Sequence, residues 1–166
     1  MIKELNYKYF SSPLGDIEIK YDKNFIYAFS FINAGVKRRE EAEIENSNVI
    51  RAEEQLKKYF EGALKKFDLP ICMEGTEFQK KVWTELTRID FGKTLSYLQM
   101  AKRLGDVKSI RAAASANGKN PFAIVVPCHR VIGTNGSLTG YAGELWRKQW
   151  LLEHEAKIAG VYQMLF

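Results

Sequence analysis

Cys128 is the residue of this sequence best placed to act as a nucleophile. It follows Pro127 and is followed directly by His129 and Arg130. Two potential cations beside a cysteine favour the thiolate, which is the nucleophilic form of the side chain. A nearby histidine can also serve as the base for a thiol when a third group orients the imidazole. On these residues alone, a structural role and a nucleophilic role for Cys128 are equally open.

The second cysteine does not share these features. Cys72 lies between Ile71 and Met73, where a free cysteine is usually a small hydrophobic side chain. With two cysteines and two histidines in 166 residues, the chain has too few soft ligands for a structural zinc site, so we expect no metal. The same count argues against a disulfide framework and favours a reducing compartment.

The charge balance and the N-terminus restrict the protein class. A net charge of +5 permits nucleic-acid binding but does not require it. The first ten residues carry Lys3, Glu4 and Lys8 and therefore lack the apolar core of a signal peptide. No apolar run approaches the length of a membrane span. We expect a cytoplasmic protein that works as a monomer.

The segments around Cys128 are expected to position it at the end of a strand. Residues 123–126 form a short β-branched run that predicts a buried strand ending just before the cysteine. A glycine-rich stretch follows, and then a helix is predicted from Glu144 to Lys157. Helical spacing puts Lys148, Leu151 and Glu155 on one face of that helix.

Upstream, the pattern predicts a helix-turn-helix. Thr76 with Gln79, and Ser96 with Gln99, have the spacing of capping boxes that open helices. The second of these helices is expected to end at Gly105, and Ser109 is expected to cap a helix over residues 110–116. Two short helices joined by a glycine-containing turn are typical of a helix-turn-helix, although any helical hairpin has a similar pattern.

The first third of the chain predicts an antiparallel meander followed by a helix. Apolar residues alternate along residues 17–21 and 25–31, and turn-forming residues separate the two runs. The charged stretch 36–46 is expected to be a solvated helix or loop. Asn48 is expected to cap a helix whose apolar face is made of Ala52, Leu56, Tyr59 and Phe60. We take residues 62–75 as a linker and place the domain boundary between 1–70 and 71–166.

Residues 120–132, which read NPFAIVVPCHRVI, resemble the active-site signature of the O6-alkylguanine-DNA alkyltransferases. The Pro-Cys-His-Arg-Val core is highly specific to that family. The resemblance continues upstream through residues 91–97 and downstream from Gly140 to Glu155. It implies an α/β fold in which a small N-terminal ribonuclease-H-like α/β unit precedes a C-terminal helical unit. That helical unit would carry the helix-turn-helix and the active-site cysteine loop.

The resemblance also implies the chemistry. Cys128 would accept the alkyl group, and His129 would take the thiol proton through a water while Glu155 orients the imidazole. Tyr97 would donate a proton to the departing purine. Asn120 would tie the helix-turn-helix to the cysteine loop, and Lys148 would complete the catalytic set. The transfer would be stoichiometric, from O6-alkylguanine and with O4-alkylthymine left open, and it would need no cofactor.

The implied DNA contacts are equally specific. A pocket for the flipped-out base would be walled by Val131, Tyr141, Ala142 and Gly143. The second helix of the helix-turn-helix would enter the minor groove of double-stranded DNA. The residues implied to contact DNA are Tyr97, Arg111, Ala112 and Thr134.

The sequence departs from the family pattern at three positions, and other functions stay open. Glu144 stands where many relatives have a second glycine, Leu98 where many have glutamine, and Ala123 where proline is frequent. These differences put the pocket size and the DNA contacts in doubt. A lesion-binding protein without transfer is an alternative, against which Cys128 argues. A sequence-specific regulator is opposed by the small residues of the second helix, and a cysteine hydrolase would need turnover.

Overall fold

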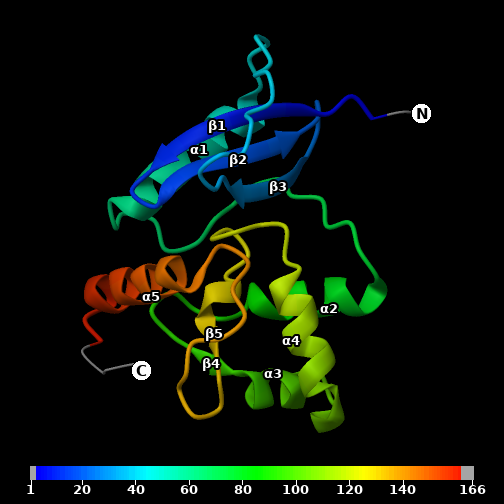
Figure 1. The fold of residues 1–166 in the computed structure, drawn as a ribbon, viewed down its shortest axis with the longest axis vertical. Coiled ribbons are helices and arrows are strands. Elements are labelled where there is room, and N and C mark those ends of the chain that lie inside the picture. Colours follow the sequence, from blue (N-terminus) through cyan, green and yellow to red (C-terminus); the bar gives the residue numbers. More distant parts are fainter. Residues whose placement is uncertain (1–2, 162–166) are drawn as a thin grey trace. The chain divides into compact units, whose positions relative to one another are not determined.

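A computed structural model describes residues 3–161, which form two compact units (Figure 1). Within this described part, the first unit runs up to Glu74 and includes Pro121–Val125. The second unit comprises Gly75–Asn120 and the chain from Val126 onward. None of the helices among the described residues is long and apolar enough to span a membrane.

The first unit is built on the predicted antiparallel meander. Its strands β1 (Asn6–Ser12), β2 (Gly15–Tyr21) and β3 (Ile26–Phe31) pair in the order β1-β2-β3. Ile19 lies opposite Phe29 in the register, and both side chains are buried. The tight β1–β2 turn uses Gly15 at φ +104°, a conformation that favours glycine. The meander prediction is confirmed.

One helix, α1 (Ser47–Phe60), packs on this sheet (Figure 1). Its predicted apolar face is largely correct, because Ala52, Leu56 and Tyr59 are buried. The predicted cap is wrong: Asn46, not Asn48, accepts hydrogen bonds from the first helical N–H groups. Asn48 lies inside the helix and donates through its side chain to the Asn24 carbonyl. The preceding charged stretch 36–46 forms neither helix nor strand.

The second unit is mainly helical and carries both predicted capping boxes. Thr76 and Gln79 cap the first helix of this unit, and Ser96 and Gln99 cap the second, each with both reciprocal hydrogen bonds present. The elements in chain order are α2 (Glu77–Leu86), β4 (Leu95–Ser96), α3 (Tyr97–Arg103), α4 (Ile110–Gly118), β5 (Val131–Ile132) and α5 (Leu145–Ala159). Strands β4 and β5 pair in parallel.

Helices α3 and α4 form the predicted helix-turn-helix. The turn between them contains Gly105 at φ +89° and a short 3₁₀ turn, Val107–Ser109. Ser109 makes no side-chain capping bond to α4, contrary to prediction; instead Asp106 caps the 3₁₀ turn by accepting from the Lys108 N–H. The indole N–H of Trp83 donates to the Ala116 carbonyl at 2.9 Å, which fixes α4 against α2.

The strand predicted over residues 123–126 is wrong. Within the first unit, Phe122 makes an isolated bridge to Phe29, and the chain then turns through Ile124 at φ +70°. Ile124 and Val126 are nevertheless buried, and the other two residues of the run are half-buried. A short apolar run has the same composition whether it forms a buried strand or a buried turn, so the pattern could not distinguish them.

Candidate active site

Cys128 lies in a 3₁₀ turn, Cys128–Arg130, that leads directly into β5. Two hydrogen bonds fix the start of this turn: the Cys128 N–H and the Asn120 side-chain N–H both donate to the Val126 carbonyl at 2.8 Å. Since β5 pairs with β4, and Tyr97 follows β4 directly, the turn and the start of α3 come together. The cysteine is 6% exposed.

Three buried ionisable groups meet beside the cysteine. His129 Nε2 lies 2.9 Å from Glu155 Oε1. The Arg130 guanidinium donates to the same carboxylate twice, from Nε to Oε2 at 2.9 Å and from Nη2 to Oε1 at 2.7 Å. Arg130 Nη1 also donates to the Ile89 carbonyl at 2.6 Å. His129 and Glu155 are almost completely buried. Glu155 is therefore the common partner of both residues that follow Cys128.

This network determines the protonation of the imidazole. Burial alone would raise the pKa of Glu155, but His129 and Arg130 hold that pKa well below its ordinary range, so the carboxylate is ionised. Burial lowers the pKa of His129 despite the opposing effect of Glu155, so the imidazole is neutral. Because Nε2 faces the carboxylate, Nε2 carries the proton and Nδ1 is the acceptor. Nδ1 is buried without a hydrogen-bond partner among the described residues.

The cysteine is a thiol in the free protein. Burial raises the pKa of Cys128, and the hydrogen bond from Asn120 and the charge of Lys148 only partly oppose that effect. The expectation that His129 and Arg130 would favour the thiolate as cations is wrong. The imidazole is neutral, and the guanidinium is paired with Glu155. Forming the nucleophile therefore needs a base, and His129 Nδ1 can accept a proton.

Lys148 is a second buried cation of this site. It lies on the inward face of α5 with Leu151 and Glu155, as the helical spacing predicted. Its ammonium group donates to the Val131 carbonyl and, at 2.9 Å, to the Thr139 carbonyl. Burial lowers the pKa of Lys148 to about 8, although Cys128 opposes that shift. Lys148 thus links α5 to β5 and to the loop after it.

Tyr97 directs its hydroxyl to the same region. The hydroxyl donates to the Thr139 carbonyl at 3.3 Å and accepts from Asn117 Nδ2, also at 3.3 Å. Burial raises the pKa of Tyr97, so the phenol is protonated and can donate. Asn117 Nδ2 also lies 3.4 Å from the Cys128 carbonyl. One amide thus contacts both the phenol and the backbone of the cysteine.

Unsatisfied polar atoms are concentrated here. Among the described residues, the buried side-chain atoms without a hydrogen-bond partner are Asn117 Oδ1, His129 Nδ1 and the Tyr141 hydroxyl. All three side chains belong to the cysteine site. Buried polar groups are nearly always paired, so such exceptions indicate a place where an external group binds or reacts.

Family models and related sequences match almost the whole described chain. Residues 5–73 match the model of the ribonuclease-like domain of 6-O-methylguanine DNA methyltransferase, and residues 77–157 match the model of its DNA binding domain. A methylated-DNA–protein-cysteine methyltransferase of Methanosarcina acetivorans is 46% identical over 152 residues, which cover 90% of this chain and 97% of that protein. The chain belongs to the 6-O-methylguanine DNA methyltransferase family.

Solved structures of the family have the same fold. The crystal structure of the Mycobacterium tuberculosis O6-methylguanine methyltransferase aligns with a TM-score of 0.82 at 35% identity, covering 93% of this chain and 94% of that one. The Mycobacterium tuberculosis OGT in complex with DNA aligns with a TM-score of 0.83 at 37% identity, covering 92% and 93% of the two chains. The predicted family resemblance and the predicted fold are confirmed.

The residues expected to form the base pocket lie on β5 and on the loop before α5. Val131 is buried, whereas Ala142 is exposed. The Arg147 guanidinium donates to the Gly143 carbonyl at 3.1 Å and holds this loop. Glu144 adopts φ +73°, a conformation that favours glycine, and its carboxylate accepts from the Trp146 indole at 2.7 Å. A strained non-glycine residue therefore stands beside the expected pocket.

Of the residues expected to touch DNA, three are exposed, whereas Tyr97 is buried. Arg111 and Ala112 are exposed on α4, and Thr134 is exposed on the loop after β5. Ser115 is exposed on α4 as well, whereas Ala113 and Ala116 are buried. The free face of the helix therefore presents one arginine among small side chains. Such a face can approach a groove closely while reading little sequence.

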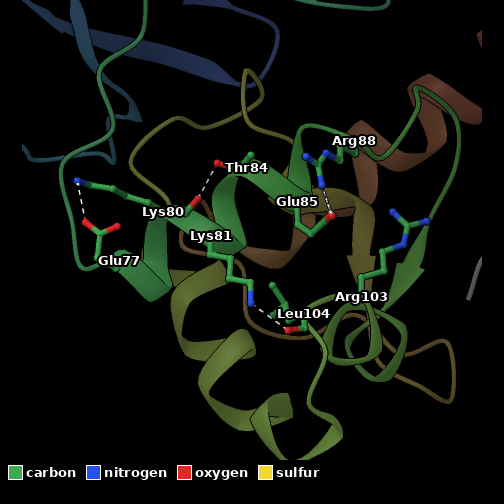
Figure 2. Close-up of a pocket in the computed structure, with 8 residues that line it drawn as sticks. All are labelled: Glu77, Lys80, Lys81, Thr84, Glu85, Arg88, Arg103 and Leu104. Atoms are coloured by element: carbon green, nitrogen blue, oxygen red, sulfur yellow. Dashed lines mark hydrogen bonds and ion pairs between the residues drawn. The ribbon is translucent and has the colours of Figure 1, made fainter.

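A separate cleft of about 340 Å³ lies along α2 and the end of α3 (Figure 2). It is lined mostly by charged side chains, several already paired, such as Arg88 with Glu85 at 2.7 Å. Lys81 donates to the Leu104 carbonyl (Figure 2). None of the predicted site residues lines this cleft, so it is distinct from the cysteine site.

Sequence reasoning missed three residues of the site. Asn117 falls just past the helix predicted over residues 110–116, Arg130 was considered only as a cation beside the cysteine, and Arg147 was not considered. A signal for Asn117 existed, because it follows Ala113 by four residues on the buried stripe of α4. Arg147 likewise precedes Leu151 by four residues on the buried face of α5. A polar residue on a buried helical face is worth treating as a candidate site residue.

Proposed function

We propose that this protein repairs O6-alkylguanine in DNA by transferring the alkyl group to Cys128 Sγ, once per molecule. The observation that carries the proposal is the buried cysteine turn itself. It combines a thiol, a neutral imidazole oriented by Glu155, and the phenol of Tyr97. Similar proteins carry the name methylated-DNA–protein-cysteine methyltransferase. O4-alkylthymine stays an open second substrate.

The proposed reaction uses each of these groups once. His129 Nδ1 takes the thiol proton through a water, and the imidazolium is stabilised by Glu155. The thiolate attacks the alkyl carbon, a bond forms between sulfur and carbon, and the bond between that carbon and guanine O6 breaks. The guanine leaves as a neutral base because Tyr97 gives it a proton. The thioether product is stable, so one turnover follows and no cofactor is needed.

Asn120 and Lys148 hold the parts in place. In the proposed mechanism, Asn120 ties the end of the helix-turn-helix to the cysteine turn through the Val126 carbonyl. Lys148 supports the carbonyls of β5 and of the following loop. The pocket for the base is formed by Val131, Tyr141, Ala142 and Gly143, whose backbone groups read the guanine edge. Placing these groups in advance lowers the entropic cost of reaching the transition state.

We propose that the substrate is double-stranded DNA from which the damaged base is extruded, at a cost of a few kcal/mol. Helix α4 enters the minor groove with its small-residue face, and the Arg111 guanidinium fills the space that the base leaves. Tyr97, Ala112 and Thr134 contact the DNA nearby. We further propose a cytoplasmic monomer divided at residue 70 into two domains. The two cysteines of the described chain, both free, agree with a reducing compartment.

Mass spectrometry after mixing with an O6-methylguanine duplex tests the proposal. We expect a gain of about 14 Da, located on the peptide that contains Cys128, as a thioether-forming transfer requires. Cys128→Ser should gain nothing, and Cys72→Ser is the matched control that should react like the wild type. Repair of the base with an unmodified Cys128 would contradict the proposal, and binding without any repair would favour a lesion-binding protein. The free O6-alkylated base, run in parallel with Arg111→Ala, isolates the DNA contact, because only duplex repair should suffer.

A further inference from the structure

We infer that Asn117 is a positioning residue for the transfer: it aims the Tyr97 hydroxyl at the departing guanine and couples that phenol to the backbone of the nucleophile. This inference rests on the proposed function. It adds to the reaction a residue of α4, the second helix of the helix-turn-helix.

The contacts of Asn117 are specific to the reacting groups. Its side chain is 2% exposed and lies in the last turn of α4. Its two hydrogen bonds are from Nδ2, to the Tyr97 hydroxyl at 3.3 Å and to the Cys128 carbonyl at 3.4 Å. Both are long, as hydrogen bonds at catalytic groups often are before substrate binds. A side chain that served packing alone would not need to contact these two groups.

The amide N–H determines where the phenol can send its proton. Because Asn117 donates to the Tyr97 oxygen, the O–H of Tyr97 must point away from Asn117. In the free protein it points to the Thr139 carbonyl at 3.3 Å. That carbonyl also accepts from Lys148, so it is a shared acceptor that the phenol can leave when a purine nitrogen arrives. Asn117 thus keeps the hydroxyl in the orientation of a donor.

The same bond stabilises the product of proton transfer. When Tyr97 gives its proton to the leaving guanine, the phenol becomes a phenolate in a buried place. A hydrogen bond to an ionised oxygen is stronger than one to a neutral oxygen, so the bond from Asn117 strengthens as the reaction proceeds. Burial, the largest effect, and the charge of Cys128 raise the pKa of Tyr97. The hydrogen bond from Asn117 acts in the opposite direction and lowers that pKa. Lys148 also faces the phenol, with Nζ 5.9 Å from the ring centre.

The oxygen of the Asn117 amide also bears on the role of this side chain. Asn117 Oδ1 is buried and has no hydrogen-bond partner among the described residues. An unpaired acceptor in a core is costly, so packing alone would not favour an asparagine here. Its retention beside the reacting phenol and thiol is explained if the N–H group is required.

The test compares two ways of alkylating the same sulfur. Transfer from O6-methylguanine needs a proton for the leaving group, whereas alkylation by iodoacetamide releases iodide and needs none. For Asn117→Ala we expect methyl transfer from the duplex to slow on the order of tenfold, the effect of losing one hydrogen bond to an ionised group. The iodoacetamide rate should stay within about twofold, since the thiol itself is not the affected group. Thr84→Ala, an exposed change on α2 away from the cysteine site, is the matched control and should leave both rates unchanged.

Two further variants keep the result interpretable. Asn117→Ser has a smaller polar side chain and covers the case in which Asn117→Ala does not fold. Without the amide, the alkaline limb of the methyl-transfer rate should move to higher pH, because Tyr97 then holds its proton more tightly. In a Tyr97→Phe background, removing the amide should cost little more, since it acts through the phenol.

The outcomes separate the two proposals. An equal loss in both alkylation reactions, or a full additional loss in the Tyr97→Phe background, would show that Asn117 only shapes the cysteine turn. An unchanged transfer rate would remove it from the mechanism. If the wild type does not alkylate Cys128 at all, the proposed function fails, and not this inference alone.

Discussion

The two units of this protein differ in whether they bury charged side chains. In the described part of the chain, every buried polar or charged residue belongs to the second unit: Asn117, His129, Arg130, Arg147, Lys148 and Glu155. Among its described residues, the first unit buries no charged side chain, and its most polar buried groups are the phenols of Tyr9, Tyr21 and Tyr59. Its ion pairs, such as Arg51–Asp68 at 3.6 Å, involve exposed side chains.

The difference indicates which part of the molecule is shaped by chemistry. Burying a charged group is unfavourable unless it is paired and hydrogen-bonded. The first unit achieves a core without such groups, so a domain of this size does not need them. The second unit tolerates several, all within the set of residues around Cys128. Their burial is better explained by the reaction than by stability.

Removing the shared carboxylate should have the largest effect on stability. Glu155→Gln keeps the shape but leaves the buried Arg130 without its counter-ion, which typically costs about 3–5 kcal/mol of unfolding free energy. Denaturant unfolding measures this loss. The matched control is Asp68→Asn, which makes the same change in an exposed pair of the first unit and should leave the midpoint unchanged. Equal effects of the two substitutions would mean that the contrast between the units has no energetic meaning.

The same carboxylate should dominate acid unfolding. The pKa of Glu155 is lower in the folded protein than its ordinary value of 4.5, so the unfolded chain binds the proton more readily. The stability contributed by the ionised carboxylate is fully present above about pH 4.5 and is lost as the pH falls below that value. Unfolding measured from pH 6 downward should therefore show a steep acid limb in the wild type. Glu155→Gln should flatten it, whereas Asp68→Asn should keep it.

Local patterns in the sequence predicted the elements well. Both capping boxes, the antiparallel meander and the inward face of α5 depend on residues within about four positions of each other, or on a simple alternation. Helical spacing alone therefore predicts that Lys148 and Glu155 lie on the inward face of α5.

The errors arose where distant contacts decide the structure. Residues 123–126 form a turn because Ile124 takes a positive φ, which no local pattern reveals. Asn46 rather than Asn48 caps α1, although both are competent caps. Burial raises the pKa of Cys128, and Arg130 pairs with Glu155, a residue 25 positions away, although the sequence shows Arg130 only as a neighbour of the cysteine. The roles of the site residues and the domain boundary at residue 70 stay predictions.

Lys148 should have a smaller effect, seen in thiol reactivity. Its ammonium group is the charge that lowers the pKa of Cys128, so Lys148→Met should raise that pKa and slow alkylation by iodoacetamide. Each unit of pKa change lowers the thiolate fraction about tenfold at a given pH. Because the pKa of Lys148 is about 8, the ratio of wild-type to variant rates should be largest below pH 8 and decrease above it. The exposed Lys157→Met on the same helix is the control. A rate ratio that stays constant across pH 8 would show that the buried ammonium supports the loop carbonyls without acting on the sulfur. Lys148 would then be buried for a structural reason and not to change the pKa of Cys128.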